Sequence, residues 1–313
     1  MTAPGRVSIV ILTHNRKEML VDLLCSLSNI RYRPLEIIVV DNHSTESPRD
    51  VITNRFPRVH LIEMEKNIGV GARNRGISST SGEIIITLDD DVIGIDDNAI
   101  HTLREIFERD PVVGAVCFKV VDPDTGNITN WCHHYRPEEY SMRSFVTNEI
   151  SEGAVAYRKA ALDVAGVYPE NFFISHEGPD LACRIMNHGY NIIFCPGVIV
   201  RHCHSSLGRV TWRRYYYDTR NLIWLAVRNY PVMYALKVLF IGIGSQCVYA
   251  IRDGHLRYWV RGVLDGIRGI KDALSERCVV SDRTMAIINE INKERPGFME
   301  MARKRLFHKG IRI

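Results

Sequence analysis

Short apolar runs alternate with amphipathic stretches through the first ninety residues of the chain. Four of the runs are rich in β-branched side chains and bounded by turn residues, which predicts buried strands at 7–13, 35–40, 59–64 and 83–88. Between them, apolar residues recur at helical spacing. Strands that alternate with helices predict a parallel sheet whose crossover connections are right-handed.

Capping residues indicate where the intervening helices begin. Asn15 offers an N-cap oxygen, and Glu18 follows three residues later, as in a capping box ahead of the apolar stripe over 19–27. A serine and a proline at 47–48 predict the start of a second helix. The glycine-rich turn at 67–71 leads into a third helix, which is expected to run to about residue 79.

The second half of the chain continues the α/β pattern with less regularity. Strands are expected at 112–120, 153–157, 191–194 and 198–201. A helix over 159–165 is expected to end at Gly166, and another is expected to begin at Pro179 and to stop before Gly189.

Polar residues follow the apolar runs at the points where parallel sheets bind ligands. Thr13, Asp41 and Asp89 each fall where a predicted strand ends, so all three are expected along one edge of the sheet. Asp89, Asp90 and Asp91 are adjacent carboxylates, the kind of ligand that Mg²⁺ and Mn²⁺ take together with phosphate oxygens. A solvated acidic turn would also explain the triplet alone. A second acid, Asp41, at the end of another strand favours a ligand-binding site over a solvated turn.

Two common nucleotide-binding motifs are excluded. The segment 69–74 has Asn74 where a dinucleotide-binding loop carries its third glycine, and it follows the third strand instead of the first. The segment 71–76 has the glycine spacing of a P-loop, but Ile77 stands where the lysine belongs. These exclusions favour a nucleotide held at the sheet edge, with a metal on its diphosphate.

Composition places the chain among ordinary globular proteins. It has 313 residues, of which 46% are hydrophobic and 24% charged, enough for one elaborate domain or two packed ones. Eight scattered cysteines without a paired motif, and an N-terminus without the apolar core of a signal peptide, predict cytoplasmic residence. Cysteines and histidines at 132–134 and 202–204 match no usual zinc spacing, so ordinary buried side chains are the preferred interpretation.

The basic surplus belongs to the C-terminal fifth, where 14 Lys and Arg face 8 Asp and Glu after residue 251. The apolar run at 238–251 is shorter than the ~20 residues that span a bilayer. An apolar stripe over 256–270 lies beside arginines and continues the basic surface toward 303–309, which favours peripheral contact with an anionic membrane. Packing on the rest of the chain, or a homodimer through these helices, is the alternative. Nucleic-acid binding is not expected, since no recognition motif accompanies the charge.

Six segments, in order, resemble the inverting glycosyltransferases of family 2, and within them the rhamnosyltransferase-like enzymes of bacterial cell-surface glycans. They are VSIVILTHNR (7–16), IIVVDNHST (37–45), NIGVGARNRG (67–76), LDDDV (88–92), GAVAYRK (153–159) and HEGPDLACR (176–184). The resemblance implies the GT-A fold, a mixed, mostly parallel α/β sheet flanked by helices. It further implies a nucleotide-sugar-binding half (1–120), an acceptor-binding half (121–209) and a helical C-terminal extension (210–313).

The resemblance also implies a reaction and a set of site residues. A hexose or deoxyhexose would move from a UDP- or dTDP-linked donor to a hydroxyl acceptor, a lipid-linked glycan among them, at the inner face of the plasma membrane. The implied metal ligands, for Mn²⁺ or Mg²⁺, are Asp89, Asp91 and His202, with His204 as the fallback; the implied acceptor contacts are Gly153 and His176. The implied nucleotide-sugar contacts are Thr13, Asn15, Arg16, Asp41, Asn67, Gly69, Arg73, Asn74, Asp89 and Asp90.

An inverting transfer needs one carboxylate to accept the proton of the attacking hydroxyl. Glu177 lies at or just ahead of a predicted helix N-terminus, where the macrodipole favours its ionised form. The commoner family pattern has Glu-Asp here, with the aspartate as base, but Gly178 replaces that aspartate. Glu177 is therefore the preferred base and Asp180 the alternative.

Two other classes of function compete with this interpretation. A sugar-1-phosphate nucleotidyltransferase shares a related sheet, but it usually carries a glycine-rich, basic loop after its first strand, whereas residues 14–18 lead directly into a helix. A non-catalytic carbohydrate-binding or scaffold protein would leave the acids at 89, 91 and 177 without a common purpose.

Overall fold

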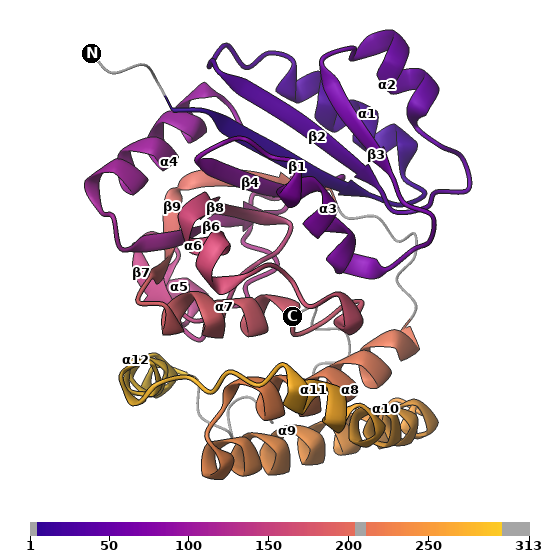
Figure 1. Ribbon diagram of the computed structural model, residues 1–313, viewed down its shortest axis with the longest axis vertical. Coiled ribbons are helices and arrows are strands. Elements are labelled where there is room, and N and C mark those ends of the chain that lie inside the picture. The colour runs from indigo at the N-terminus through magenta and orange to yellow at the C-terminus, as the bar shows by residue number, and fades with distance from the viewer. Residues whose placement is uncertain (1–4, 204–210, 296–313) are drawn as a thin grey trace.

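A nine-stranded mixed sheet runs through the protein, with helices packed on both of its faces and a group of helices from the C-terminal region beside it (Figure 1). The computed structural model describes residues 5–203 and 211–295. The basic residues at 303–309 and His204 lie outside these ranges.

The first four strands form the parallel part of the sheet in the order β3-β2-β1-β4, which confirms the prediction from the alternating pattern. Their bounds are β1 Val7–Thr13, β2 Leu35–Asp41, β3 Val59–Glu63 and β4 Ile84–Asp89. The connecting helices are α1 Lys17–Leu27, α2 Arg49–Arg55 and α3 Arg73–Ser78, the last preceded by the 3-10 turn η1 Gly69–Ala72.

The remaining strands extend the sheet beyond β4, largely by antiparallel pairing. β8 (Ala154–Arg158) lies between β4 and β6 (Val113–Val121), and β9 (Asn191–His202) follows β6 in parallel. Two short strands pair with β9, namely β5 Val92–Ile93 and β7 Phe145–Thr147. The two strands predicted at 191–194 and 198–201 are one strand, because the residues around Pro196 form an irregularity inside a continuous pairing with β6.

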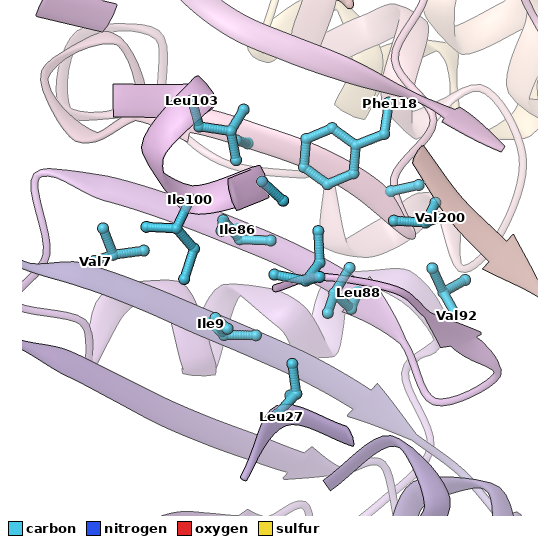
Figure 2. Packing of buried hydrophobic residues seen from close by; sticks show 14 of the residues in the cluster. Val7, Ile9, Leu27, Ile86, Leu88, Val92, Ile100, Leu103, Phe118 and Val200 are labelled. Carbon is cyan, nitrogen blue, oxygen red and sulfur yellow. The ribbon is translucent and has the colours of Figure 1, made fainter. Parts of the chain in front are cut away.

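The two faces of the sheet carry separate apolar cores, as alternation along the strands requires. Ile9 and Ile11 of β1 face one core, and Val10 faces the other. On the first face, strand residues pack against α4 (Asp97–Arg109), as Figure 2 shows for Ile9, Ile86, Leu88, Ile100, Leu103 and Phe118. The second core includes residues of α6 (Lys159–Ala165) and α7 (Glu177–Asn187).

The C-terminal region is helical, and α8 (Thr211–Asn229) connects it to the sheet domain through contacts with α7. The other helices are α9 Val232–Arg252, α10 Leu256–Arg268, α11 Ile270–Ser275 and α12 Asp282–Lys293. α9 is 21 residues long and is therefore longer than the apolar run at 238–251 that it contains. By length and composition alone α9 would suffice to cross a membrane.

Two helix starts differ from their predicted positions because tertiary contacts outweigh local capping signals. Asn15 is not the N-cap of α1; its φ is 55°, and its side chain accepts a hydrogen bond from the Thr45 N–H at 2.7 Å instead. α7 begins at Glu177, two residues before Pro179, with His176 as its N-cap in a left-handed conformation.

Candidate active site

The carboxyl ends of β1, β2 and β4 meet at one edge of the sheet, as predicted. Thr13 is in register with Asp41, and Leu12 is in register with Asp89. The residues that end three different strands therefore lie side by side, although 76 positions of sequence separate the first from the last. The aspartates that follow Asp89 extend this row.

Asp90 is buried at this edge and bound by two residues from the start of the chain. Its carboxylate accepts a hydrogen bond from the Thr13 hydroxyl at 2.8 Å and pairs with Arg16 at 3.1 Å. Burial raises the pKa of Asp90 to about 6, because the charges and hydrogen bond of these neighbours offset only part of the desolvation. The structure gives Asp90 the role of a link between β1 and β4.

Asp91 lies between a cation and an imidazole. Its Oδ2 is 2.9 Å from Arg16 Nη1, and its Oδ1 is 3.1 Å from His202 Nε2. The other ring nitrogen of His202 contacts the Asn130 side-chain amide. Both Asp91 and His202 are buried, so the carboxylate and the imidazole are held facing one another.

Asp89 points toward α3, where its carboxylate pairs with the fully buried Arg73. Gly153 makes this orientation possible, since a Cβ at that position would overlap the Asp89 carboxylate. The small residue thus makes room for a protein carboxylate, whereas the resemblance had assigned it to the acceptor.

Residues 67–74, which run from the turn before α3 into its first residues, contact other parts of the protein through side chains that the resemblance assigned to the nucleotide. Asn74 is buried, and its amide bonds the backbone N–H and carbonyl of Tyr168, at 3.1 and 2.8 Å. Gly69 has a φ of 71°, and a Cβ there would overlap the Phe173 carbonyl. Asn67 accepts hydrogen bonds from Asn42 and from the Gly69 N–H. This segment therefore fixes the 168–173 region against the sheet.

Asp41 is buried at the end of β2, and the N–H and hydroxyl of Ser44 donate to its Oδ1 at 3.1 and 2.5 Å.

The start of α7 is held by a clamp from the C-terminal region. Three of the four residues before it have positive φ: Phe173, Ser175 and His176. The Asn221 amide of α8 donates to the carbonyls of residues 172, 174 and 175, at 2.7 to 2.9 Å. Such backbone conformations cost of order 1–3 kcal/mol each and persist only where the surroundings fix them. α8 thereby determines where Glu177 lies.

Glu177 is 3% exposed, and burial, followed by the nearby Glu152, raises its pKa well above the usual value. The structure differs here from the expectation that the helix N-terminus keeps Glu177 ionised. The desolvation of a fully enclosed carboxyl outweighs the macrodipole, whose effect is typically below about 1 kcal/mol.

Asp180 is excluded as the base by its surroundings. It is 0% exposed, and its two oxygens are bound by Arg184 at 3.0 Å, Arg228 at 2.8 Å and Asn229 at 2.9 Å. A carboxylate with this set of partners holds α7 against α8 and has no access to a substrate.

Glu152 was not predicted as a site residue from the sequence. In the fold its side chain lies against Gly178, in the first turn of α7. The Gly178 N–H donates to its carboxylate, and its pKa is raised to about 7, chiefly by burial. Two signals point to it in the sequence: it directly precedes Gly153, and a glycine stands at 178.

The residues at the strand ends fit a divalent ion only in part. Within residues 5–203 and 211–295, no three His, Cys, Asp or Glu side chains gather closely enough to enclose a metal. Asp91 and His202 are one carboxylate and one imidazole in contact, both of them ligand types for Mn²⁺. Ions of this class often take few protein ligands and complete their shell with water and substrate phosphates. The pair therefore fits a metal that arrives with a nucleotide.

Residues 8–166 match the model of glycosyl transferase family 2. The chain belongs to this family, and it is a glycosyltransferase. Membership removes both the nucleotidyltransferase and the scaffold alternatives.

Relatives and solved structures agree with this assignment. The chain is 24% identical over 227 residues to the O-antigen chain rhamnosyltransferase RfbN of Salmonella typhimurium, covering 67% of this chain and 70% of that protein. It is 25% identical to the N-acetylglucosaminyl-diphospho-decaprenol L-rhamnosyltransferase of Mycobacterium tuberculosis, over 64% and 77% of the two chains. The structure of GalNAc-T7 with UDP, GalNAc and Mn²⁺ superposes with a TM-score of 0.66 at 17% identity, covering 95% of this chain and 59% of that one. The shared fold is GT-A.

Proposed function

We propose that this glycosyltransferase is metal-dependent and inverting, and that it moves a sugar from a nucleoside diphosphate donor to a hydroxyl acceptor. One observation supports this most strongly: contacts connect the strand-end aspartates to the start of α7. Asp90 contacts Thr13 at the end of β1, and both Asp90 and Asp91 pair with Arg16. The Asp89 N–H donates to the Gly153 carbonyl, and the neighbouring Glu152 contacts the start of α7. Donor and acceptor groups would thus meet along one rim.

The donor would lie along the β1, β2 and β4 ends. Asp41 would hydrogen-bond the base, with Thr13, Asn15 and Arg16 approaching the rest of the nucleotide, while the buried Arg73 would hold Asp89 in place. Asp91 and His202 would hold the divalent ion, which when bound offsets negative charge on the diphosphate as it leaves. Support for the ion comes from the carboxylate–imidazole pair and from the Mn²⁺ in the GalNAc-T7 structure.

The chemical step is a single displacement. The acceptor hydroxyl loses its proton to a carboxylate as its oxygen attacks the anomeric carbon from the face opposite the diphosphate. The bond to the diphosphate breaks as the new bond forms, so the anomeric configuration inverts. No covalent intermediate with the protein is required.

Incubation with a panel of nucleotide sugars tests this function. We expect release of a nucleoside diphosphate from a UDP- or dTDP-linked donor only when Mn²⁺ or Mg²⁺ is present, and loss of release with excess EDTA. Nuclear magnetic resonance of the product would show an anomeric configuration opposite to that of the donor. Retention of configuration, or full turnover in EDTA, would contradict the proposal.

The acceptor side supports a phosphate-bearing, lipid-linked substrate. A cavity of about 630 Å³ lies between His176 at the start of α7 and the helices α8, α9 and α12. Its charged lining residues are four cations and one acid: Arg214, Lys237, Lys293, Arg295 and Asp218. The relative from Mycobacterium tuberculosis is named for a diphospho-decaprenol acceptor.

The outer surface of α9 and α10 supports placement on the inner face of the plasma membrane. Phe240 is 85% exposed and Met233 is 78% exposed, and further apolar side chains of α9 and α10 are exposed: Val232, Leu236, Val248, Ile251, Leu256, Val260, Leu264 and Ile267. Arg261 and Arg268 add exposed positive charge on α10. Apolar residues flanked by cations match an anionic lipid surface better than they match water.

We expect the protein to sediment with vesicles that contain phosphatidylglycerol, and far less with pure phosphatidylcholine. A Phe240→Glu variant should bind about 10- to 100-fold more weakly, since burying one large apolar side chain contributes roughly 1.5–3 kcal/mol. Met142→Glu is the matched control, because Met142 is 74% exposed but lies before β7, away from these helices. Equal loss in both variants, or no binding by the unaltered protein, would exclude this surface as the membrane contact.

A further inference from the structure

Three carboxylates surround the first turn of α7, and they differ in their access to solvent. Asp180 is completely buried and Glu177 is 3% exposed, whereas Glu152 is partly exposed. A group that takes a proton from a bound acceptor has to come within hydrogen-bonding distance of it. Of the three residues, Glu152 is the most exposed and is therefore the best placed for that contact.

Gly178 creates the space that the Glu152 carboxylate occupies. A Cβ at position 178 would overlap Oε1 of Glu152 and would lie 2.5 Å from the carbonyl oxygen of Ile150. The Gly178 N–H instead donates a hydrogen bond to the same carboxylate. Gly178 has no side chain, and the Glu152 side chain occupies the space at the helix N-terminus that a side chain at 178 would fill.

The backbone of Glu152 is fixed to the strand that ends at the site. The Thr87 hydroxyl of β4 donates to the Glu152 carbonyl at 2.7 Å, and the Asp89 N–H donates to the Gly153 carbonyl at 3.2 Å. Glu152 therefore lies between the strand-end aspartates, where the donor would bind, and the start of α7, and His176, which precedes that helix, lines the cavity proposed for the acceptor. Its position is therefore between the proposed donor site and the proposed acceptor site.

We propose that Glu152 is the catalytic base of this glycosyltransferase, with Glu177 as its buried partner. This inference rests on the proposed function. The acceptor O–H bond breaks with its proton passing to the Glu152 carboxylate, and the oxygen pair forms the bond to the anomeric carbon. The bond from that carbon to the diphosphate breaks, and its electron pair leaves with the diphosphate.

The charges around Glu152 agree with this role. Burial raises its pKa to about 7, with Arg73 opposing the rise and Asp89 adding to it. Glu177, which also faces Asp218 of α8, has its pKa raised further. Two carboxyls that share one enclosed site favour a single proton between them. Burial raises the pKa of both carboxyls, and Glu177 is the more deeply buried of the two.

Paired glutamine variants test the inference. Glu152→Gln should lower the rate of transfer by about 10²- to 10⁴-fold, the usual contribution of a general base. The affinity of the variant for UDP or dTDP in the presence of Mn²⁺, measured by calorimetry, should stay within a few-fold of that of the unaltered protein. Glu149→Gln is the matched control, because Glu149 lies three residues away and pairs with His134 at 3.1 Å; it should keep its activity.

A second variant keeps the test decisive if Glu152→Gln folds poorly. Glu152→Ala with added formate should regain part of the transfer rate as the formate concentration rises, whereas Glu177→Ala should not. Unchanged transfer by Glu152→Gln, or rescue of the Glu177 variant alone, would overturn the assignment and leave the proposed function intact. Absence of transfer by the unaltered protein with every donor would instead reject the function itself.

Discussion

Replacing Asp91 by alanine should reduce sugar transfer by about 10³-fold or more and abolish the stimulation of nucleotide binding by Mn²⁺. Asp91 is the buried carboxylate that His202 contacts at 3.1 Å, and together they are the pair that fits a divalent ion. A metal at a leaving diphosphate contributes several kcal/mol of charge stabilisation, and each 1.36 kcal/mol corresponds to tenfold in rate. Electron paramagnetic resonance of Mn²⁺ reports the binding directly, independent of turnover.

Asp124→Ala provides the control for this experiment, because Asp124 is an exposed acid in the turn after β6. His202→Ala should resemble Asp91→Ala in Mn²⁺ binding, since each removes one member of the same pair. Normal Mn²⁺ binding in both variants would place the ion elsewhere. Circular dichroism would check that each variant keeps the secondary structure of the unaltered protein.

The sheet edge could be predicted from sequence because its causes are local and periodic. Each β-branched run sets one strand, helices between the runs force the strands to be parallel, and parallel strands place residues 13, 41 and 89 at the same edge. The end of the helix at Gly166 also follows from a single residue, whose φ is 77°. The arrangement of the parallel strands could therefore be predicted from the sequence.

The region around the start of α7 depends on contacts between residues far apart in the chain, which sequence patterns do not reveal. Glu152 and Gly178 are 26 positions apart, and neither is unusual until the overlap between a Cβ at 178 and the carboxylate is seen. Asn15 and Asn74 show the same effect. Each carries a plausible local or ligand-binding role, and each proves to bond a backbone segment on another element.

Asp180 illustrates why a first-turn acid is ambiguous in sequence. Helix capping, catalysis and a buried ion pair all place an acid in the first turn of a helix. The partner that decides among them, Arg228, lies 48 positions further on, in α8. Only the packing of α8 on α7 shows that the carboxylate is enclosed.

Asp180→Ala should therefore act on stability, lowering the free energy of unfolding by about 3–5 kcal/mol. Arg228 is nearly buried and Arg184 largely so. Without Asp180, Arg228 keeps the half-exposed Glu276 and Arg184 keeps the carbonyls of Ala165 and Val167, but neither cation keeps a buried carboxylate. Breaking a buried pair by deleting one partner typically costs this much, because a charge stays desolvated without compensation. Urea titration monitored by fluorescence measures the loss as a fall in the transition midpoint.

Asp163→Ala is the matched control, because it removes an aspartate from an exposed ion pair instead of a buried one. Asp163 and Lys159 are four residues apart on α6, and the aspartate side chain is 57% exposed, so its removal should cost no more than about 0.5 kcal/mol. A loss below about 1 kcal/mol for Asp180→Ala would contradict the structural role and restore Asp180 as a candidate base. Because Asp180 holds α7 against α8, the unfolding loss should be accompanied by weaker transfer at temperatures below the transition, even though its carboxylate contacts no substrate.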